Sequence, residues 1–280
     1  MPAAIMVKTL EEFIYPTQQK LFKKLCRMHA GKILISKGSF VLVQGATPVM
    51  LVAHLDTVHE QPVRDICRSE DNNIWMSPQG IGGDDRCGVY ALNVVYELTG
   101  GLPWLLFTCD EEIGGLGAEV FCDCYALKEL PPELDLLKFI VEIDRRGATD
   151  AVYYGCHNAA FEDYITGKGF ITAHGSFSDI SVIAPALGVA AVNLSSGYYN
   201  AHTQHEYINR AELETVIEKV CEMVCDAALP GFPTYEYDTR LTECYYDDEN
   251  YYGECGCYGE SSCYGETGWD FLPDWVYNQK

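Results

Sequence analysis

Three consecutive carboxylates follow an apolar run in the stretch FTCDEEIGGLGAE, which spans Phe107–Glu119. Asp110, Glu111 and Glu112 would repel one another if all three were ionised and simply solvated. A bound cation would offset that repulsion, so this stretch indicates a candidate cation site. Such a site needs further ligands from other parts of the chain.

Histidine and carboxylate residues form four further clusters, which offer ligand atoms of the kind a cation needs. Each cluster alone has an ordinary explanation, because an aspartate in a glycine-rich turn often caps a helix and a lone histidine often lies on the surface. Their common placement favours a shared site, since most of them follow a predicted strand directly. The residues are His54 and Asp56 in VAHLDTVHE, Asp84 and Asp85 in GIGGDDRCGVYAL, Asp144 in VEIDRRG, and His202, His205 and Glu206 in YYNAHTQHEYI.

Imidazole and carboxylate together form a ligand set that suits zinc, cobalt or manganese. Two such metals held close together need a carboxylate between them to offset their mutual repulsion. Metal pairs of this kind serve hydrolases, because they activate a water and polarise the carbonyl group of the bond to be cleaved. The clusters therefore indicate hydrolytic chemistry.

Short runs rich in valine, isoleucine and leucine predict the buried strands that carry these clusters. Amphipathic patterns predict helices over Pro16–Ala30, Gly88–Leu98 and Arg210–Leu229, and Asn209 is placed to cap the last of them. Strands that alternate with helices predict an α/β fold with a mostly parallel sheet, in which ligands bind beyond the carboxyl ends of the strands. The predicted strands are Ile33–Ser36, Phe40–Val43, Val49–Leu55, Leu102–Thr108, Leu137–Ile143 and Val189–Leu194.

Composition excludes several classes of partner. The formal net charge of −22 argues against nucleic acid and anionic membranes, which would repel the chain. We expect neither a signal peptide nor a membrane-spanning helix, because no basic segment precedes a long apolar stretch. The thirteen cysteines follow no framework spacing over most of the chain, which is typical of reduced thiols. We therefore expect a cytoplasmic protein.

The composition changes near Pro233. The last part of the chain is acidic and rich in tyrosine, glycine and cysteine, and a six-residue unit recurs from Tyr252, Tyr258 and Tyr264 as YGECGC, YGESSC and YGETGW. Units this short and glycine-rich are typical of a flexible appendage rather than a solenoid. The sequence thus predicts a catalytic domain over residues 1–232 and a tail over 233–280 that is dispensable for catalysis.

The ordered motifs HLD, GGDD, CDEE, EID and NAHTQHE resemble those of the dinuclear zinc exopeptidase superfamily, over roughly residues 10–230. The chain is most similar to the branch that contains peptidase T, carboxypeptidase G and aminoacylase. The resemblance implies a three-layer αβα fold and two divalent cations, zinc first and cobalt or manganese as alternatives. It also implies that His54 and Asp144 hold one metal, that Glu112 and His202 hold the other, and that Asp84 bridges them.

Further roles follow from the same resemblance. Asp56 would lie behind His54 and fix its tautomer, and Glu111 would be the general base that takes a proton from the attacking water. Asp85 is the alternative to Asp84, because the doublet allows a register error of one. Asp110 is interpreted as a solvated or backbone-bonded neighbour of the metal site rather than a metal ligand. His205 and Glu206 are interpreted as supporting or capping residues, and His29 and His59 as structural ones.

The chain departs from many members of the superfamily between Asp144 and His202. Many relatives insert a lid or dimerisation domain there, whereas this chain has only 57 positions that already carry strand and helix patterns. We therefore expect a monomer or weak oligomer. Arg145 and Arg146 could bind a substrate carboxylate or serve as ordinary surface or ion-pair residues.

Three functions remain open at this point. The first is a metal-dependent aminopeptidase or di/tripeptidase, and the second is an amidohydrolase that deacylates N-acyl amino acids. Motifs alone do not separate them, because the same metal chemistry cleaves any suitably held amide. The third is an inactive metal-binding scaffold whose tail recruits partners. The presence of Glu111 argues against the scaffold, since a protein without turnover has no need of a base.

Overall fold

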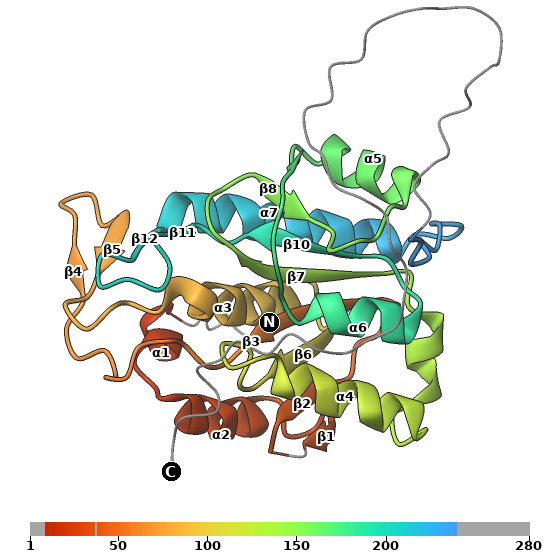
Figure 1. Ribbon diagram of the computed structural model, residues 1–280, viewed down its shortest axis with the longest axis horizontal. Coiled ribbons are helices and arrows are strands. Elements are labelled where there is room, and N and C mark those ends of the chain that lie inside the picture. Colours follow the sequence, from red (N-terminus) through yellow and green to blue (C-terminus); the bar gives the residue numbers. More distant parts are fainter. Residues whose placement is uncertain (1–8, 37, 240–280) are drawn as a thin grey trace, which may run out of the picture. The chain divides into compact units, whose positions relative to one another are not determined.

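A computed structural model (Figure 1) describes residues 9–36 and 38–239 of the 280-residue chain. The chain divides into two units, residues 1–242 and 243–280, and all described residues lie in the first. The repeat that begins at Tyr252 lies outside the described residues.

An eight-stranded mixed sheet forms the centre of the fold. Its four middle strands, β6, β3, β7 and β10, run parallel to one another. β2 and β8 are antiparallel to the inner strands they join, and the outermost strands are β1 and β9. In sheet order the strands are β1 (Ile33–Ser36), β2 (Phe40–Val43), β6 (Trp104–Thr108), β3 (Val49–His54), β7 (Phe139–Arg145), β10 (Ala191–Ser195), β8 (Asp150–Val152) and β9 (Ile171–Thr172).

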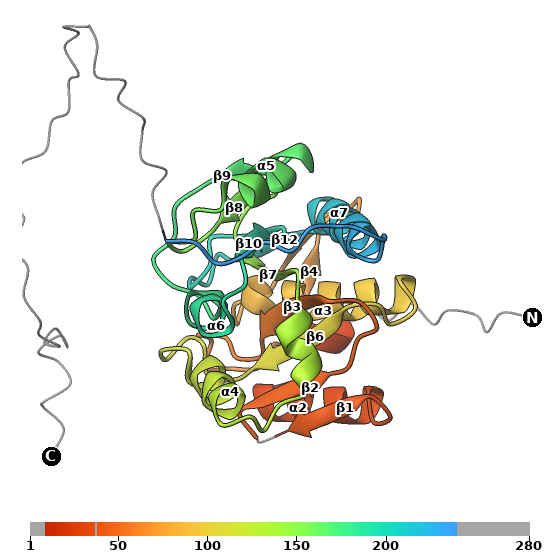
Figure 2. The same cartoon turned by 90° about the vertical axis from the view of Figure 1, so that its right-hand side faces the viewer.

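The middle strands are buried on both faces, which is why they appear in the sequence as continuous apolar runs. Along β3, Val49 and Leu51 enter one hydrophobic core and Met50 and Val52 enter the other, as the alternation of a strand requires. Helices cover both faces and complete the predicted three-layer αβα fold (Figure 2). One face carries α1 (Glu11–Ile14), α2 (Gln18–Met28), α3 (Gly83–Leu98), α5 (Ala159–Gly167) and α7 (Arg210–Ala227), and the other carries α4 (Leu116–Ala126), η1 (Pro132–Leu136) and α6 (Ile180–Leu187).

A second, four-stranded sheet was not predicted. It is antiparallel throughout, in the order β11 (Tyr198–Tyr199), β12 (Tyr207–Asn209), β5 (Ile74–Met76) and β4 (Cys67–Arg68). Its strands are only two or three residues long, too short for a clear alternating pattern. The sheet holds the two ends of the loop that contains His202, so it contributes directly to the arrangement of the site.

Helix α7 begins where the sequence predicts, because the Asn209 side chain accepts a hydrogen bond from the backbone N–H of Glu212. Glu212 does not return a bond to the cap and instead accepts one from the hydroxyl of Tyr199. None of the described helices is long and apolar enough to cross a membrane.

Most of the residues between Asp144 and His202 belong to the main layers, where they form β8, α5, β9, α6 and β10, and the last of them form β11 of the second sheet. The compact unit also continues past residue 232. Tyr235 is buried, and its ring lies 5.0 Å from that of Phe161 between ring centroids. Its backbone exchanges hydrogen bonds with Lys138 and Ala190, so this short segment is held to the sheet.

Candidate metal centre

The carboxyl ends of the parallel strands bring the predicted clusters together. His54 ends β3, Glu111 and Glu112 follow β6, and Asp144 lies near the end of β7. Asp84 comes from the turn that opens α3. His202 comes from the β11–β12 loop, so the site combines segments spread over nearly 150 residues.

His54 forms the centre of the first group of ligand atoms. Its Nε2 atom lies 3.2 Å from Oδ1 of Asp84 and 3.6 Å from Oδ1 of Asp144. The imidazole is buried, as is most of the Asp144 side chain. Two carboxylates thus converge on one ring nitrogen from different strands and turns.

His202 forms the centre of the second group. Its Nε2 atom lies 3.2 Å from Oδ2 of Asp84 and 3.1 Å from Oε2 of Glu112. The His202 side chain is 56% exposed, in contrast to the buried His54. This second group therefore lies on the solvent side of the site.

Asp84 belongs to both groups, and its two carboxylate oxygens face different imidazoles. One ligand atom each from Asp84, Glu112 and His202 lie within 4.8 Å of one another. Two imidazoles and three carboxylates in this arrangement fit a pair of borderline-hard divalent cations that share one carboxylate. The donor set present thus suits the metals that the resemblance implies.

Asp85 lies close to the same cluster, and one of its oxygens also lies within 4.8 Å of ligand atoms of His54 and Asp144. Its two oxygens already accept backbone hydrogen bonds, from His54 at 3.3 Å and from Gly88 at 2.9 Å. Those bonds tie the start of α3 to the end of β3. Asp85 is therefore occupied structurally, which favours Asp84 as the shared ligand.

Asp56 lies behind His54, with its Oδ1 atom 3.2 Å from Nδ1 of the imidazole. The same carboxylate accepts the backbone N–H groups of Glu111 at 3.1 Å and Glu112 at 3.0 Å. Burial alone would raise the pKa of Asp56, but the bonds and charge of His54 and the two backbone donors lower it. One carboxylate thus orients both the imidazole and the loop that carries the two glutamates.

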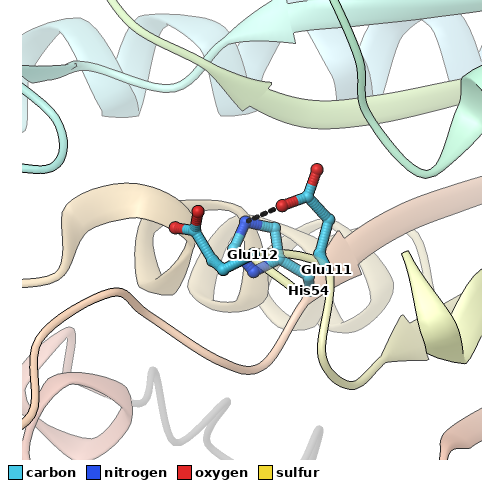
Figure 3. A group of neighbouring side chains, drawn as sticks. All are labelled: His54, Glu111 and Glu112. Atoms are coloured by element: carbon cyan, nitrogen blue, oxygen red, sulfur yellow. Dashed lines mark ion pairs between the residues drawn. The ribbon is translucent and has the colours of Figure 1, made fainter. Parts of the chain in front are cut away.

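The two glutamates point in different directions from that loop. Figure 3 shows the Glu111 carboxylate reaching toward the ring of His54 while Glu112 extends to the other side of it. Oε2 of Glu111 lies 4.0 Å from Nε2 of His54, farther than the bond that Glu112 makes with His202. The two adjacent carboxylates are therefore separated: that of Glu112 contacts His202, and that of Glu111 faces His54 at a longer distance.

Asp110 turns away from both groups. It has a left-handed backbone conformation with φ of 61°, and its Oδ1 accepts a hydrogen bond from Nε2 of Gln18 at 2.8 Å. Its own N–H donates to the Gln18 side chain. The three consecutive carboxylates, Asp110, Glu111 and Glu112, thus have three different environments.

Burial and charge shift the titration of the site. Burial raises the pKa of Glu111 to about 8 and, with the charge of Asp84, that of Asp144 to about 7. The hydrogen bond with Asp84 raises the pKa of His202 to about 9. Burial would lower the pKa of His54, but the charge and hydrogen bond of Asp144 raise it well above its usual value. The metal-free site therefore retains protons near neutral pH that a bound cation would replace.

Glu206 supports Asp84 from behind. This buried carboxylate accepts hydrogen bonds from the backbone N–H groups of Gly82 at 2.8 Å and Asp84 at 2.9 Å. It also pairs with Nε2 of His59 at 2.8 Å. The supporting role expected for Glu206 thus has a defined geometry, while His205 is exposed near it.

Three residues around Asp144 were not singled out in the sequence. Asn193 on β10 accepts the backbone N–H of Asp144 and donates to its carbonyl, both at 2.9 Å. The hydroxyls of Ser178 and Tyr198 each donate to the Asp144 carboxylate at 3.3 Å. A buried asparagine inside the apolar run VAAVNL is the signal that could have identified this support.

The remaining histidines lie outside the two groups. His29 is buried in the core and bonds to Asn93, which agrees with its structural interpretation. His157 and His174 border a separate small cavity near α5.

A cavity of about 530 Å³ opens onto the candidate metal ligands. Acidic residues and His202 form one part of its lining, and Arg145, Arg146 and several aromatic residues form another. This size suits a small ligand rather than a folded protein. The lining residues are Asp84, Glu111, Glu112, Asp144, Arg145, Arg146, Tyr154, Ser176, Phe177, Tyr198, Tyr199, Asn200, Ala201 and His202.

Comparison with known proteins identifies the fold. No protein-family model matches the chain, and no curated protein matches it. The structure is similar to a tripeptidase from Staphylococcus aureus, with a TM-score of 0.58 and 14% identity over 78% of this chain and 96% of that one. It is also similar to the aminopeptidase PepT from Bacillus cereus, with a TM-score of 0.57 and 14% identity over 80% and 100% of the two chains.

A third similar structure is the TET1 peptidase from Pyrococcus horikoshii, which can assemble into a tetrahedron or a large octahedral shell. Its TM-score is 0.52, with 12% identity over 77% of this chain and 98% of that one. At such low identities the likeness shows the fold alone. The fold expected from the resemblance to the dinuclear zinc exopeptidases is thereby confirmed.

Proposed function

We propose that the chain is a metal-dependent exopeptidase, an aminopeptidase or di/tripeptidase that cleaves small peptides with two divalent cations. The observation that carries this proposal is the position of Asp84, whose two carboxylate oxygens lie 3.2 Å from Nε2 of His54 and 3.2 Å from Nε2 of His202. A carboxylate shared between two ligand groups is what a pair of neighbouring cations needs. The similarity to peptidase structures supports the same reading.

The ligand groups divide naturally between the two cations. His54 and Asp144 would hold one, Glu112 and His202 would hold the other, and Asp84 would contact both. Zinc fits this donor set best, and cobalt and manganese are the alternatives. Cations bound there would supply a nucleophilic water at neutral pH and Lewis acidity at the scissile carbonyl.

The chain's own residues carry the proton transfers. Glu111 faces the site without a close ligand contact, which leaves its carboxylate free to act as a general base. It takes the proton of the attacking water and passes it to the leaving amine. Asp56 holds His54 in the tautomer that leaves Nε2 free for a cation.

Substrate size and cellular setting belong to the same proposal. A cavity of about 530 Å³ favours a di- or tripeptide over a long chain. We propose a cytoplasmic protein that acts as a monomer or weak oligomer, with a tail that is not needed for catalysis. Large assemblies do occur with this fold, as the TET1 peptidase shows, so light scattering of the purified protein is needed to test this part.

The test is a substrate screen with the purified protein loaded with zinc, cobalt or manganese. Di- and tripeptides, aminoacyl anilides and N-acyl amino acids are compared, with and without a chelator and after metal is restored. Cleavage of peptides that the chelator abolishes and metal restores supports the proposal. Cleavage of N-acyl amino acids alone would identify a deacylase instead. A protein that holds two metals and cleaves nothing would be a metal-binding scaffold.

A further inference from the structure

Two arginines follow Asp144 directly and line the cavity next to the candidate metal ligands. They are unusual there, because the other charged lining residues are four carboxylates and one histidine, in a chain whose net charge is −22. A cation placed beside a cation-binding site has no obvious use in holding metal. The contacts of each arginine side chain therefore indicate which other role that arginine has.

Arg145 is engaged within the fold. Its Nη2 donates to the backbone carbonyl of His174 at 3.1 Å, and its Nε lies 3.5 Å from a carboxylate oxygen of Asp150. The side chain is only 20% exposed. These contacts hold Arg145 against β8 and against the segment that follows β9, so its guanidinium serves the packing of this edge of the sheet.

Arg146 is different, because its backbone is fixed while its side chain is exposed. Its carbonyl accepts a hydrogen bond from Oγ of Ser195 at 2.9 Å, and the next residue, Gly147, exchanges backbone hydrogen bonds with Gly197 and Tyr198 at 2.9 Å. Within residues 9–36 and 38–239, the Arg146 guanidinium has no hydrogen bond or ion pair. The backbone of Arg146 is thus fixed, while its guanidinium lines the cavity without a hydrogen bond or ion pair to the described residues.

The charge of the cavity explains what Arg146 would attract. Two divalent cations would offset the four carboxylates Asp84, Glu111, Glu112 and Asp144. The guanidinium of Arg146 would then be the exposed charge in the lining of the cavity. It would repel the ammonium group of a peptide and attract an anion. The N-terminal end of a peptide is thereby directed away from Arg146 and its C-terminal part toward it.

We propose that Arg146 binds a carboxylate of the substrate and so selects peptides that carry one close to the scissile bond. This inference rests on the proposed exopeptidase function. The planar guanidinium can hold a carboxylate through two parallel hydrogen bonds, which lysine cannot do. The carboxylate comes either from the C-terminus of a di- or tripeptide or from an acidic side chain after the scissile bond. Arg146 is thus a specificity-determining residue.

The experiment uses the full-length, zinc-loaded protein and two matched pairs of peptides. Leu-Gly-Gly is compared with its C-terminal amide, and Leu-Glu-amide is compared with Leu-Gln-amide. For at least one pair, we expect kcat/KM to favour the acid by about ten- to a hundredfold, as a charge-assisted hydrogen bond implies. The pair that shows the preference identifies the source of the carboxylate.

The variant Arg146→Gln should bring that acid-to-neutral ratio close to one, through KM more than kcat, without loss of bound zinc. Arg146→Lys should keep only part of the preference for the acidic peptide, because lysine retains the charge but cannot form two parallel hydrogen bonds with a carboxylate. Arg27→Gln is the matched control, since Arg27 is exposed on α2 and does not line the cavity. It should keep the wild-type ratio.

Three outcomes would overturn the inference, and they differ in what they say about the function. Equal cleavage of acid and neutral peptides by the wild type, or an unchanged ratio in Arg146→Gln, would refute the role of Arg146 and leave the exopeptidase function intact. Failure of the wild type to cleave any of the four peptides with both metals bound would refute the function and the inference together.

Discussion

Replacing Glu111 with glutamine separates the proposed base from the proposed ligands. The Glu111 carboxylate lies 4.0 Å from Nε2 of His54, whereas the ligand contacts of His202 with Asp84 and Glu112 are 3.2 and 3.1 Å. Glutamine preserves the shape of glutamate but its amide does not accept the proton of water. We expect Glu111→Gln to keep both metals and to lose about 10²- to 10⁴-fold in kcat.

Glu112→Gln is the matched comparison, because it makes the same chemical change at the adjacent residue. Glu112 contacts His202 directly, so its replacement removes an anionic ligand and weakens one metal. Excess zinc should then partly restore its activity, and should not restore that of Glu111→Gln. The assay is metal content by elemental analysis together with peptide turnover, with and without added zinc. Loss of metal in Glu111→Gln with full loading of Glu112→Gln would refute the assignment, and full activity of both would refute the hydrolase.

Three other predictions concern pH, the residue behind His54 and the tail. Burial raises the pKa of Asp144 to about 7, and the hydrogen bond between His202 and Asp84 raises the pKa of His202 to about 9. The metal-free folded chain therefore holds protons that the unfolded chain has already released, and it loses stability as the pH rises through 7 to about 9. Zinc replaces those protons, so the gain in Tm on adding zinc should be larger at about pH 8 than at about pH 5.5, and an equal gain would contradict this. Asp56→Asn should lower zinc affinity or kcat by about 10- to 100-fold, measured by competition with a chelator and by turnover, because the amide fixes His54 and the glutamate loop less well. Truncation after Thr242 should leave kinetics near wild type, whereas truncation before Pro233 should lower Tm, because it removes Tyr235 from its contacts with Phe161 and Phe139; equal Tm values for the two truncations would disprove this.

The central strands could be predicted because burial on both faces leaves a continuous apolar run in the sequence. β2 agrees with its predicted bounds, Phe40–Val43, and β3 ends one residue early, at His54. Helix α7 could be predicted from its apolar stripe and its asparagine cap. Short strands such as β4, which has two exposed residues, carry no pattern of their own and depend on partners elsewhere in the chain.

The residues of the candidate site could be proposed because each cluster follows a strand end or precedes a helix. The contacts that support them could not, because they join segments far apart in the chain. Glu206 bonds to the backbone of Gly82, 124 positions earlier, and nothing in either local sequence indicates that pairing. Tyr198 likewise reaches Asp144 across 54 positions. Helix α3 is kinked near its start, because Asp84 and Asp85 have non-helical backbone angles, so its regular part follows Asp85 and starts close to the predicted Gly88.

The shared role of Asp84 is tested most directly by anomalous diffraction at the zinc absorption edge from crystals of the zinc-loaded protein. We expect two peaks per chain, about 3.5–4 Å apart, with the Asp84 carboxylate between them. One peak should lie about 2.0–2.2 Å from ligand atoms of His54 and Asp144, and the other should lie equally close to Glu112 and His202. A single peak, or a pair bridged by Asp85 or bound by Glu111 in place of Glu112, would contradict the proposed metal centre.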